Sequence, residues 1–292
     1  MEPAGFLNPK RLLRESRLYP VLDSWRTRFD RQRSRARFQR HLRPSDLFLV
    51  GHPKSGNTWL AYMLAVLRDR DLEDGITLAN VTARVPAVHG AEARIAQHAA
   101  LPEPRIFRNE WPVSPDLYPR SVYLVRDPRA ALVSMFHMYR VLYPRDRIEM
   151  AEFVDEYLAH GCIRRWEPRL VRWDRQVEAW RARRERGARV LVVRFEDMVA
   201  DRARALREAA AFAGIHASAP VFEHAVARGS FAAMRADEEA HGAAAYPGRK
   251  RERGRFIRRG EPDSWRDEMA PQLAARIERA FAPGMRALGY LE

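Results

Sequence analysis

The chain has 292 residues, of which 46% are hydrophobic, and its formal net charge is +14. This length and apolar content suffice to bury the core of one large α/β domain or two small ones, so a disordered chain is excluded as the first expectation. The single cysteine, Cys162, excludes an intrachain disulfide and indicates folding in a reducing compartment. No apolar run is long enough to cross a bilayer, and the N-terminus lacks the apolar core of a signal peptide, so we expect a cytoplasmic protein.

Positive charge is concentrated at the N-terminus. Residues 1–44 hold twelve basic residues against four carboxylates, a net charge of +8, and we expect a basic arm there, ahead of a folded domain of residues 45–292. Apolar residues are interleaved with the arginines, so the arm is expected to pack on the domain, with an anionic membrane surface or a partner as the alternative. A nucleic-acid-binding protein should instead show a basic stripe with exposed aromatics, whereas the charge here lies in one arm and one loop.

The first folded segment combines a strand, a glycine-rich loop and a helix. Residues 47–50 are apolar and predict a strand buried on both faces, residues 51–56 predict a loop, and the apolar spacing after Thr58 predicts a packed helix. A loop between a strand and a helix presents backbone N–H groups at the positive end of the helix dipole. We therefore predict an anion-binding site in this loop.

The loop differs from that of nucleoside triphosphatases and kinases. Gly51, Gly56 and Thr58 have the spacing of the G-x-x-x-x-G-K-[ST] motif, but Asn57 occupies the lysine position. The nearby lysine, Lys54, lies three residues earlier, inside the turn. A P-loop kinase or ATPase is thus disfavoured, while binding of a phosphate or sulfate group is not.

Apolar segments alternate with helical patterns along the rest of the chain. Further strands are expected at residues 105–108, 121–125 and 189–193, and helices at residues 128–140, 151–160, 170–186 and in an Ala- and Arg-rich segment that ends at Gly214. Asp127 and Pro128 are a typical helix start. A polar segment of residues 237–260 precedes a final helix, expected to begin at Asp263, pass Pro271 and end near Gly284.

This alternation predicts a single α/β domain with a central parallel β-sheet flanked by helices. Ligands of such sheets bind beyond the carboxyl ends of the strands. The turns at residues 51–56 and 126–128 should meet at that edge.

Five separated segments resemble motifs of sulfotransferases that use 3′-phosphoadenosine 5′-phosphosulfate (PAPS). The matching residues are Pro53 to Trp59, with Asn57 where the family usually has threonine; Val122 to Arg129 with Ser134; Phe195 to Met198, often written Tyr-Glu-Asp; and the pair Ser230 to Met234 and Arg258 to Gly260, the latter usually Arg-Lys-Gly. The resemblance covers residues 47 to about 266 and implies a P-loop-like strand-loop-helix that binds phosphosulfate.

The resemblance also implies the roles of individual residues. The phosphosulfate would be bound by Lys54, Ser55, Gly56, Asn57 and Thr58; the 3′-phosphate by Arg126, Ser134, Arg258, Arg259 and Gly260; the adenine would be flanked by Trp59 and Phe231; and Phe195, Ser230 and Met234 would complete the nucleotide contacts. No metal is required by this chemistry, and no spacing of His, Cys, Asp and Glu resembles a metal site.

Sulfuryl transfer needs a stabilised leaving oxygen and a base for the acceptor. Lys54 would stabilise the leaving oxygen. Many members of the family place a histidine base after the second strand, but here Glu110 stands at that position, with His52 as the fallback base. We expect the acceptor to be a hydroxyl, ahead of an amine, of a small molecule, a carbohydrate or a lipid-linked compound, bound by residues 70–100, 140–165 and 237–256.

Overall fold

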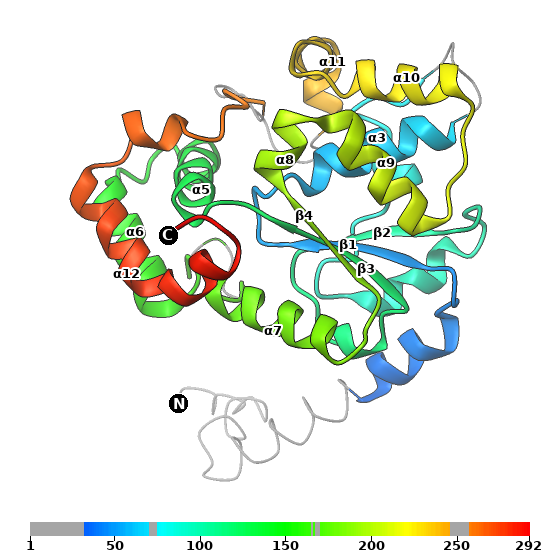
Figure 1. Ribbon diagram of the computed structural model, residues 1–292, viewed down its shortest axis with the longest axis horizontal. Helices are drawn as coiled ribbons and strands as arrows, with labels where there is room; N and C mark the ends of the chain where they lie inside the picture. Colours follow the sequence, from blue (N-terminus) through cyan, green and yellow to red (C-terminus); the bar gives the residue numbers. More distant parts are fainter. Residues whose placement is uncertain (1–31, 70–74, 165, 167–169, 246–256) are drawn as a thin grey trace, which may run out of the picture.

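The computed structural model describes residues 32–69, 75–164, 166, 170–245 and 257–292. At its centre lies one sheet of four parallel strands in the order β2-β1-β3-β4. The strands are β1 (Leu47–Gly51), β2 (Ile106–Asn109), β3 (Arg120–Val125) and β4 (Val190–Arg194). Each begins and ends within one or two residues of the predicted segment, and the predicted parallel α/β domain is confirmed (Figure 1).

Helices cover both faces of the sheet (Figure 1). Alternate residues of β1 point to opposite faces: Leu47 and Leu49 join one apolar cluster, and Phe48 and Val50 join the other. The first cluster contains residues of α3 (Asn57–Arg68), α8 (Phe195–Ala200), α9 (Arg202–Ala213), α10 (Ala219–Arg228) and α11 (Phe231–Ala245), and the second contains residues of α5 (Pro128–Leu142), α6 (Met150–His160), α7 (Trp173–Glu185) and α12 (Pro271–Ala287). The connections contain α4 (Val81–Arg84) and the short 3₁₀ turns η1 (Glu92–His98), η2 (Pro115–Leu117) and η3 (Ser264–Asp267).

Local signals fixed several helix ends as predicted. The carboxylate of Asp127 accepts a hydrogen bond from the backbone N of Arg129 at 2.8 Å and caps α5. Helices α6 and α9 end at Gly161 and Gly214, whose φ angles of 73° and 71° lie in the left-handed region that favours glycine.

The C-terminal third corrects two predictions. Residues 237–245, expected to be irregular, continue α11, and the rest of that expected acceptor-binding segment, residues 246–256, lies outside the described residues. The final helix begins at Pro271 instead of Asp263, because proline lacks the N–H needed in a helix interior but fits its first turn. It continues past Pro283 to Ala287.

The described end of the N-terminal arm lies on the domain. Residues 32–41 are helical, and Phe38 is only 1% exposed. Its ring packs edge-on against Phe48 at 5.9 Å and Tyr118 at 5.8 Å between centroids. Residues 1–31 are outside the described part of the chain, so membrane or partner contact there stays a prediction. Among the helices that the structure describes, none combines the length and apolarity needed to cross a bilayer.

Candidate functional site

The candidate site lies where the strand order reverses. In the order β2-β1-β3-β4, the chain adds β2 on one side of β1 and then β3 on the other side. The loops that follow the neighbouring strands β1 and β3 therefore run apart from each other. Parallel sheets bind ligands at such a crevice, beyond the carboxyl ends of the strands. The structure thus brings the loop of residues 52–56 and the turn of residues 126–127 to one edge, as predicted from the sequence.

The backbone of the first loop is shaped for an anion. A Cβ on Gly51 would lie 2.2 Å from the carbonyl oxygen of Leu124, so only glycine fits where the loop leaves the sheet. Lys54 and Gly56 have φ angles of 70° and 96°, and Gly56 is the N-cap of α3. A left-handed turn beside a helix N-terminus forms a concave, positively polarised surface, which binds anions.

Arg126 is a buried cation beside this loop. It is 9% exposed, its guanidinium lies 4.0 Å from the ring centroid of Phe195, and its Nη1 donates to the carbonyl oxygen of Lys54 at 3.1 Å. Its Nε is buried and has no hydrogen-bond partner within the described residues. Burial lowers its pKa to about 10, although the carboxylates of Glu196 and Asp127 act against this shift, so the side chain is protonated at neutral pH. A buried, charged donor without a partner fits a phosphate group.

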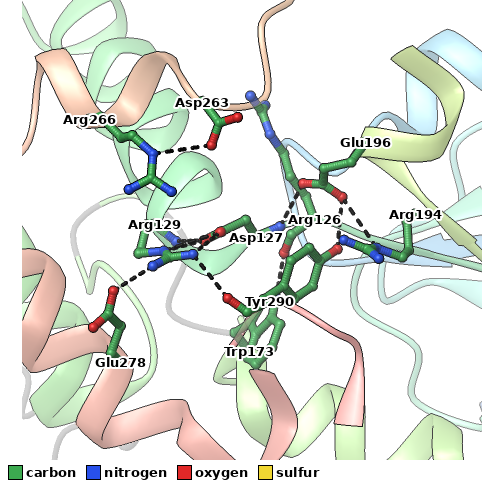
Figure 2. A network of polar contacts seen from close by, with 10 residues as sticks. All are labelled: Arg126, Asp127, Arg129, Trp173, Arg194, Glu196, Asp263, Arg266, Glu278 and Tyr290. Carbon is green, nitrogen blue, oxygen red and sulfur yellow. Dashed lines mark hydrogen bonds and ion pairs between the residues drawn. The ribbon is translucent and has the colours of Figure 1, made fainter. Parts of the chain in front are cut away.

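Figure 2 shows how the carboxylates around Arg126 are used. Asp127 binds the guanidinium of Arg129 at 2.5 Å, and Glu196 accepts from the backbone N of Asp127 at 3.0 Å. The side chain of Arg126 extends away from the Asp127–Arg129 pair (Figure 2). Its guanidinium lies instead beside the first loop, where it contacts the carbonyl oxygen of Lys54.

The other residues predicted for the 3′-phosphate lie in two further segments. Ser134 is half-buried on α5. Arg258 donates from Nη1 to Glu268 at 2.7 Å, and Arg259 lies 3.6 Å from the same carboxylate. A Cβ on Gly260, whose φ is 73°, would lie 2.6 Å from the ring of Phe231, which ties this segment to the start of α11.

The predicted adenine-flanking residues differ in exposure. The Nε1 of Trp59 donates to the carbonyl oxygen of Gly229 at 2.8 Å, and its ring lies edge-on to Phe195. Phe231 is 40% exposed and so has a face available to a base. Ser230 accepts from the backbone N of Ala233 at 3.2 Å and caps α11.

Met234, by contrast, is 4% exposed and packs in the apolar cluster beneath α11. This side chain contributes to the core of the domain.

Glu110 lies one residue beyond β2 and reaches the first loop. Its Oε1 accepts a hydrogen bond from Asn57 Nδ2 at 3.3 Å. Its backbone N donates to His89 Nδ1 at 3.1 Å, and its backbone O accepts from Gln176 Nε2 at 3.3 Å. Contacts from three segments therefore hold Glu110 beside the loop that is expected to bind an anion.

Residues that the sequence analysis did not single out support this placement. The Oε1 of Glu92, which is 5% exposed, accepts from the backbone N of Val113 at 2.7 Å, the backbone N of Ser114 at 3.0 Å and the hydroxyl of Tyr118 at 2.6 Å. These bonds fix the loop that follows β2 and carries Glu110. Glu92 is 18 residues from Glu110 in the chain, and no local sequence signal connects them.

His52 is poorly placed to act as the fallback base. It is 1% exposed, its Nδ1 lies 3.1 Å from the carbonyl oxygen of Pro53, and its Nε2 lies 2.7 Å from the hydroxyl of Tyr157. Because the carbonyl oxygen of Pro53 can only accept, Nδ1 carries the hydrogen of the neutral ring, and Nε2 accepts from the Tyr157 hydroxyl, which itself accepts from the backbone N of Trp173. Burial lowers the pKa of His52 to about 4. Both ring nitrogens are thus occupied inside the protein, which disfavours His52 relative to Glu110.

The hydroxyls of Thr58 and Ser55, at the start of α3 and in the loop before it, differ in their hydrogen bonding. Thr58 Oγ1 accepts from Arg108 Nη1 at 3.0 Å, whereas the Oγ of Ser55 is buried and has no partner within the described residues. Among the residues that the structure describes, no group of three or more His, Cys, Asp and Glu side chains could hold a metal ion.

The fold and the site define an α/β protein with a P-loop-like strand-loop-helix and a buried, protonated arginine beside its loop. The sulfotransferase domain model matches residues 44–289, so the chain belongs to the family of PAPS-dependent sulfotransferases that its motifs indicate. It is 27% identical to cytosolic sulfotransferase 12 of Arabidopsis thaliana over 267 residues, which cover 84% of this chain and 78% of that protein. It is 22% identical to the amine sulfotransferase of Oryctolagus cuniculus, over 84% of this chain and 82% of that protein.

Solved sulfotransferase structures share the fold. Mouse sulfotransferase SULT7A1 complexed with PAP, the 3′,5′-bisphosphate of adenosine, is similar with a TM-score of 0.63 and 22% identity, covering 84% of this chain and 85% of that chain. Retinol dehydratase in complex with androsterone and PAP is similar with a TM-score of 0.62 and 21% identity, covering 84% of this chain and 81% of that chain.

Proposed function

We propose that the protein transfers a sulfuryl group from PAPS to a hydroxyl of an acceptor, with Glu110 as the general base and Lys54 stabilising the leaving oxygen. The observation that carries this proposal is the contact between Glu110 and Asn57, because it joins a carboxylate to the loop expected to bind phosphosulfate. Membership of the sulfotransferase family supports the reaction class.

The described residues fit PAPS as the donor. The 3′-phosphate distinguishes PAPS from ATP, and the buried Arg126 with its unpartnered Nε supplies a donor for such a group. Arg258 and Arg259 add two cations on a neighbouring segment. When bound, PAPS supplies the activated sulfuryl group, and transfer to oxygen requires no metal ion.

Different residues of the chain would remove the proton of the acceptor and stabilise the leaving oxygen. Glu110 would accept the proton of the acceptor hydroxyl, a role that a carboxylate fills only while ionised. Lys54, on the strained left-handed turn, would stabilise negative charge that grows on the leaving oxygen. The N-terminus of α3 acts in the same direction, because its dipole is positive there.

The acceptor is proposed to be a hydroxyl, ahead of an amine, of a small molecule, a carbohydrate or a lipid-linked compound. Relatives show that the fold accommodates varied acceptors, since one is named an amine sulfotransferase and one structure holds androsterone. A screen with labelled PAPS against a phenol, a sterol, a sugar and an amine tests this ranking.

Nucleotide binding tests the cofactor directly. Calorimetry without magnesium should give PAP a Kd at least about 100-fold below that of AMP, because two charge-assisted phosphate contacts contribute roughly 1.5–3 kcal/mol each. Equal affinities would remove the cofactor assignment, and a strict magnesium requirement would favour the kinase alternative.

A further inference from the structure

One carboxylate, outside the residues that the motifs single out, joins two parts of the 3′-phosphate region. Glu268 follows η3, and its side chain is 14% exposed. Its Oε1 accepts from Arg258 Nη1 at 2.7 Å, and its Oε2 lies 2.5 Å from His137 Nε2 on α5. Glu268 therefore joins its own segment, which includes Arg258 ten residues earlier, to α5, which is 131 residues away in the sequence at His137.

Arg258 is fixed at both its backbone and its side chain. Its carbonyl oxygen accepts from Arg235 Nη1 of α11 at 3.0 Å. Its guanidinium donates to Glu268 through Nη1, and the side chain is 28% exposed. The planar guanidinium has five N–H donors, so one bond to Glu268 leaves further donors that can bind a ligand as far as the described residues show.

Charge repulsion makes such an anchor necessary. Arg258 is close enough to Arg126 that its charge lowers the pKa of Arg126, an effect smaller than that of burial. The two cations repel each other, and the carboxylate of Glu268, which is bonded to Arg258, counteracts this repulsion. Burial raises the pKa of Glu268, but its bonds to Arg258 and His137 outweigh this and hold the pKa below its ordinary value, so the carboxylate is ionised at neutral pH.

Both carboxylate oxygens of Glu268 are bound within the protein. Its second oxygen is bound to His137, which lies one helical turn beyond Ser134 on the same face of α5. A movement of the Glu268 side chain would break this bond as well as the one to Arg258. The carboxylate therefore holds α5 and the segment of Arg258 in a fixed position relative to each other.

We propose that Glu268 is a positioning residue that aims Arg258 at the 3′-phosphate and so sets the preference for 3′-phosphorylated adenosine nucleotides. This inference rests on the proposed use of PAPS. Glu268 would thus affect the nucleotide specificity through Arg258, without contacting the nucleotide itself.

The test compares the affinities of PAP and AMP in Glu268→Gln by magnesium-free calorimetry. Glutamine keeps the size of the side chain but removes the charge. We expect the Kd of PAP to rise roughly 5- to 30-fold, as for loss of a charge-assisted hydrogen bond, while that of AMP changes less than about twofold. Asp263→Asn is the matched control, because it removes the same charge from the same segment, at a side chain that is 77% exposed and pairs with Arg266 outside the proposed site. The control should leave both affinities within about twofold.

A double-mutant cycle with Arg258→Ala shows whether Glu268 acts through Arg258. In that background, Glu268→Gln should change the Kd of PAP by less than about twofold, since the Arg258 guanidinium that Glu268 positions is absent. Unchanged or tighter PAP binding in Glu268→Gln, or equal losses for PAP and AMP, would overturn the inference. If the parent protein itself does not prefer PAP, the cofactor assignment fails instead. Should Glu268→Gln not fold, Glu268→Asp keeps the charge but is too short for both partners, and the same ratio of affinities should fall.

Discussion

Glu110→Gln tests the proposed base most directly. Glutamine retains an oxygen that can accept from Asn57, a bond of 3.3 Å in the native protein, but it cannot take a proton. A general base contributes on the order of 10²- to 10⁴-fold, so turnover should fall by that factor. The affinity for PAP should stay within about twofold, because the backbone contacts of Glu110 to His89 and Gln176 do not involve the carboxylate.

Asn57 allows the position of the carboxylate to be tested separately. Its Nδ2 donates to Glu110 and, at 3.4 Å, to the carbonyl oxygen of His52, so both amide hydrogens are used. A hydrogen bond to a charged group contributes roughly 1.5–3 kcal/mol, and Asn57→Ala should therefore slow turnover about 10- to 100-fold. In the Glu110→Gln background, the same substitution should cost much less, because the charged acceptor is gone.

The assay is a single-turnover measurement with labelled PAPS and the best acceptor from the screen, which separates the transfer step from product release. Glu178→Gln is the matched control, since Glu178 lies on α7 with a side chain that is 70% exposed, and it should leave the rate unchanged. Turnover of Glu110→Gln within about threefold of the parent would refute the reasoning and move the base elsewhere. Additive losses in the cycle would show instead that Asn57 acts on another group.

Two further predictions concern Lys54 and the arm. Lys54→Ala should lower turnover on the order of 10²- to 10³-fold with little change in the Kd of PAP, because the interaction strengthens in the transition state; parallel losses in both quantities would contradict this role. Phe38→Ala should lower the free energy of unfolding by about 3–5 kcal/mol in a urea titration, because this ring is 1% exposed. A loss below about 1 kcal/mol would mean that the helix of residues 32–41 contributes little to the domain.

The fold could be predicted where its signals are local. Strands β1 and β3 are buried over their whole length; β1 ends at Gly51, which permits the next turn, and Asp127, two residues after β3, caps the next helix. Such signals depend on neighbours in the sequence, so they also located the loop of residues 52–56 and the start of α5.

The rest of the site depends on contacts between residues that are far apart in the chain. Glu268 and His137 are separated by 131 residues, and nothing in the neighbourhood of either indicates the other. The burial of His52 and Met234 is likewise decided by helices that pack over them from elsewhere in the chain. A motif can therefore show which residues line a site without showing which of their atoms are already bound within the protein.

Glu196 illustrates this distinction in the segment that resembles the Tyr-Glu-Asp motif. Its carboxylate accepts from the backbone N of Asp127 at 3.0 Å and from the hydroxyl of Tyr290 at 2.9 Å (Figure 2). The carbonyl oxygen of Arg126 accepts from Trp173 Nε1 at 3.0 Å, so the turn after β3 is held on both sides.

The carboxylates nearest to Arg126 are thus bound to other groups, Asp127 to Arg129 and Glu196 to Tyr290 and the backbone. A buried charge without a direct counter-ion is costly, and that cost falls when a ligand brings negative charge to it. The network fixes the position of Arg126 without neutralising it. If Arg126 binds the 3′-phosphate as proposed, a nucleotide that carries this phosphate would gain the interaction and one without it would not, which is the reason that we expect PAP to bind more tightly than AMP.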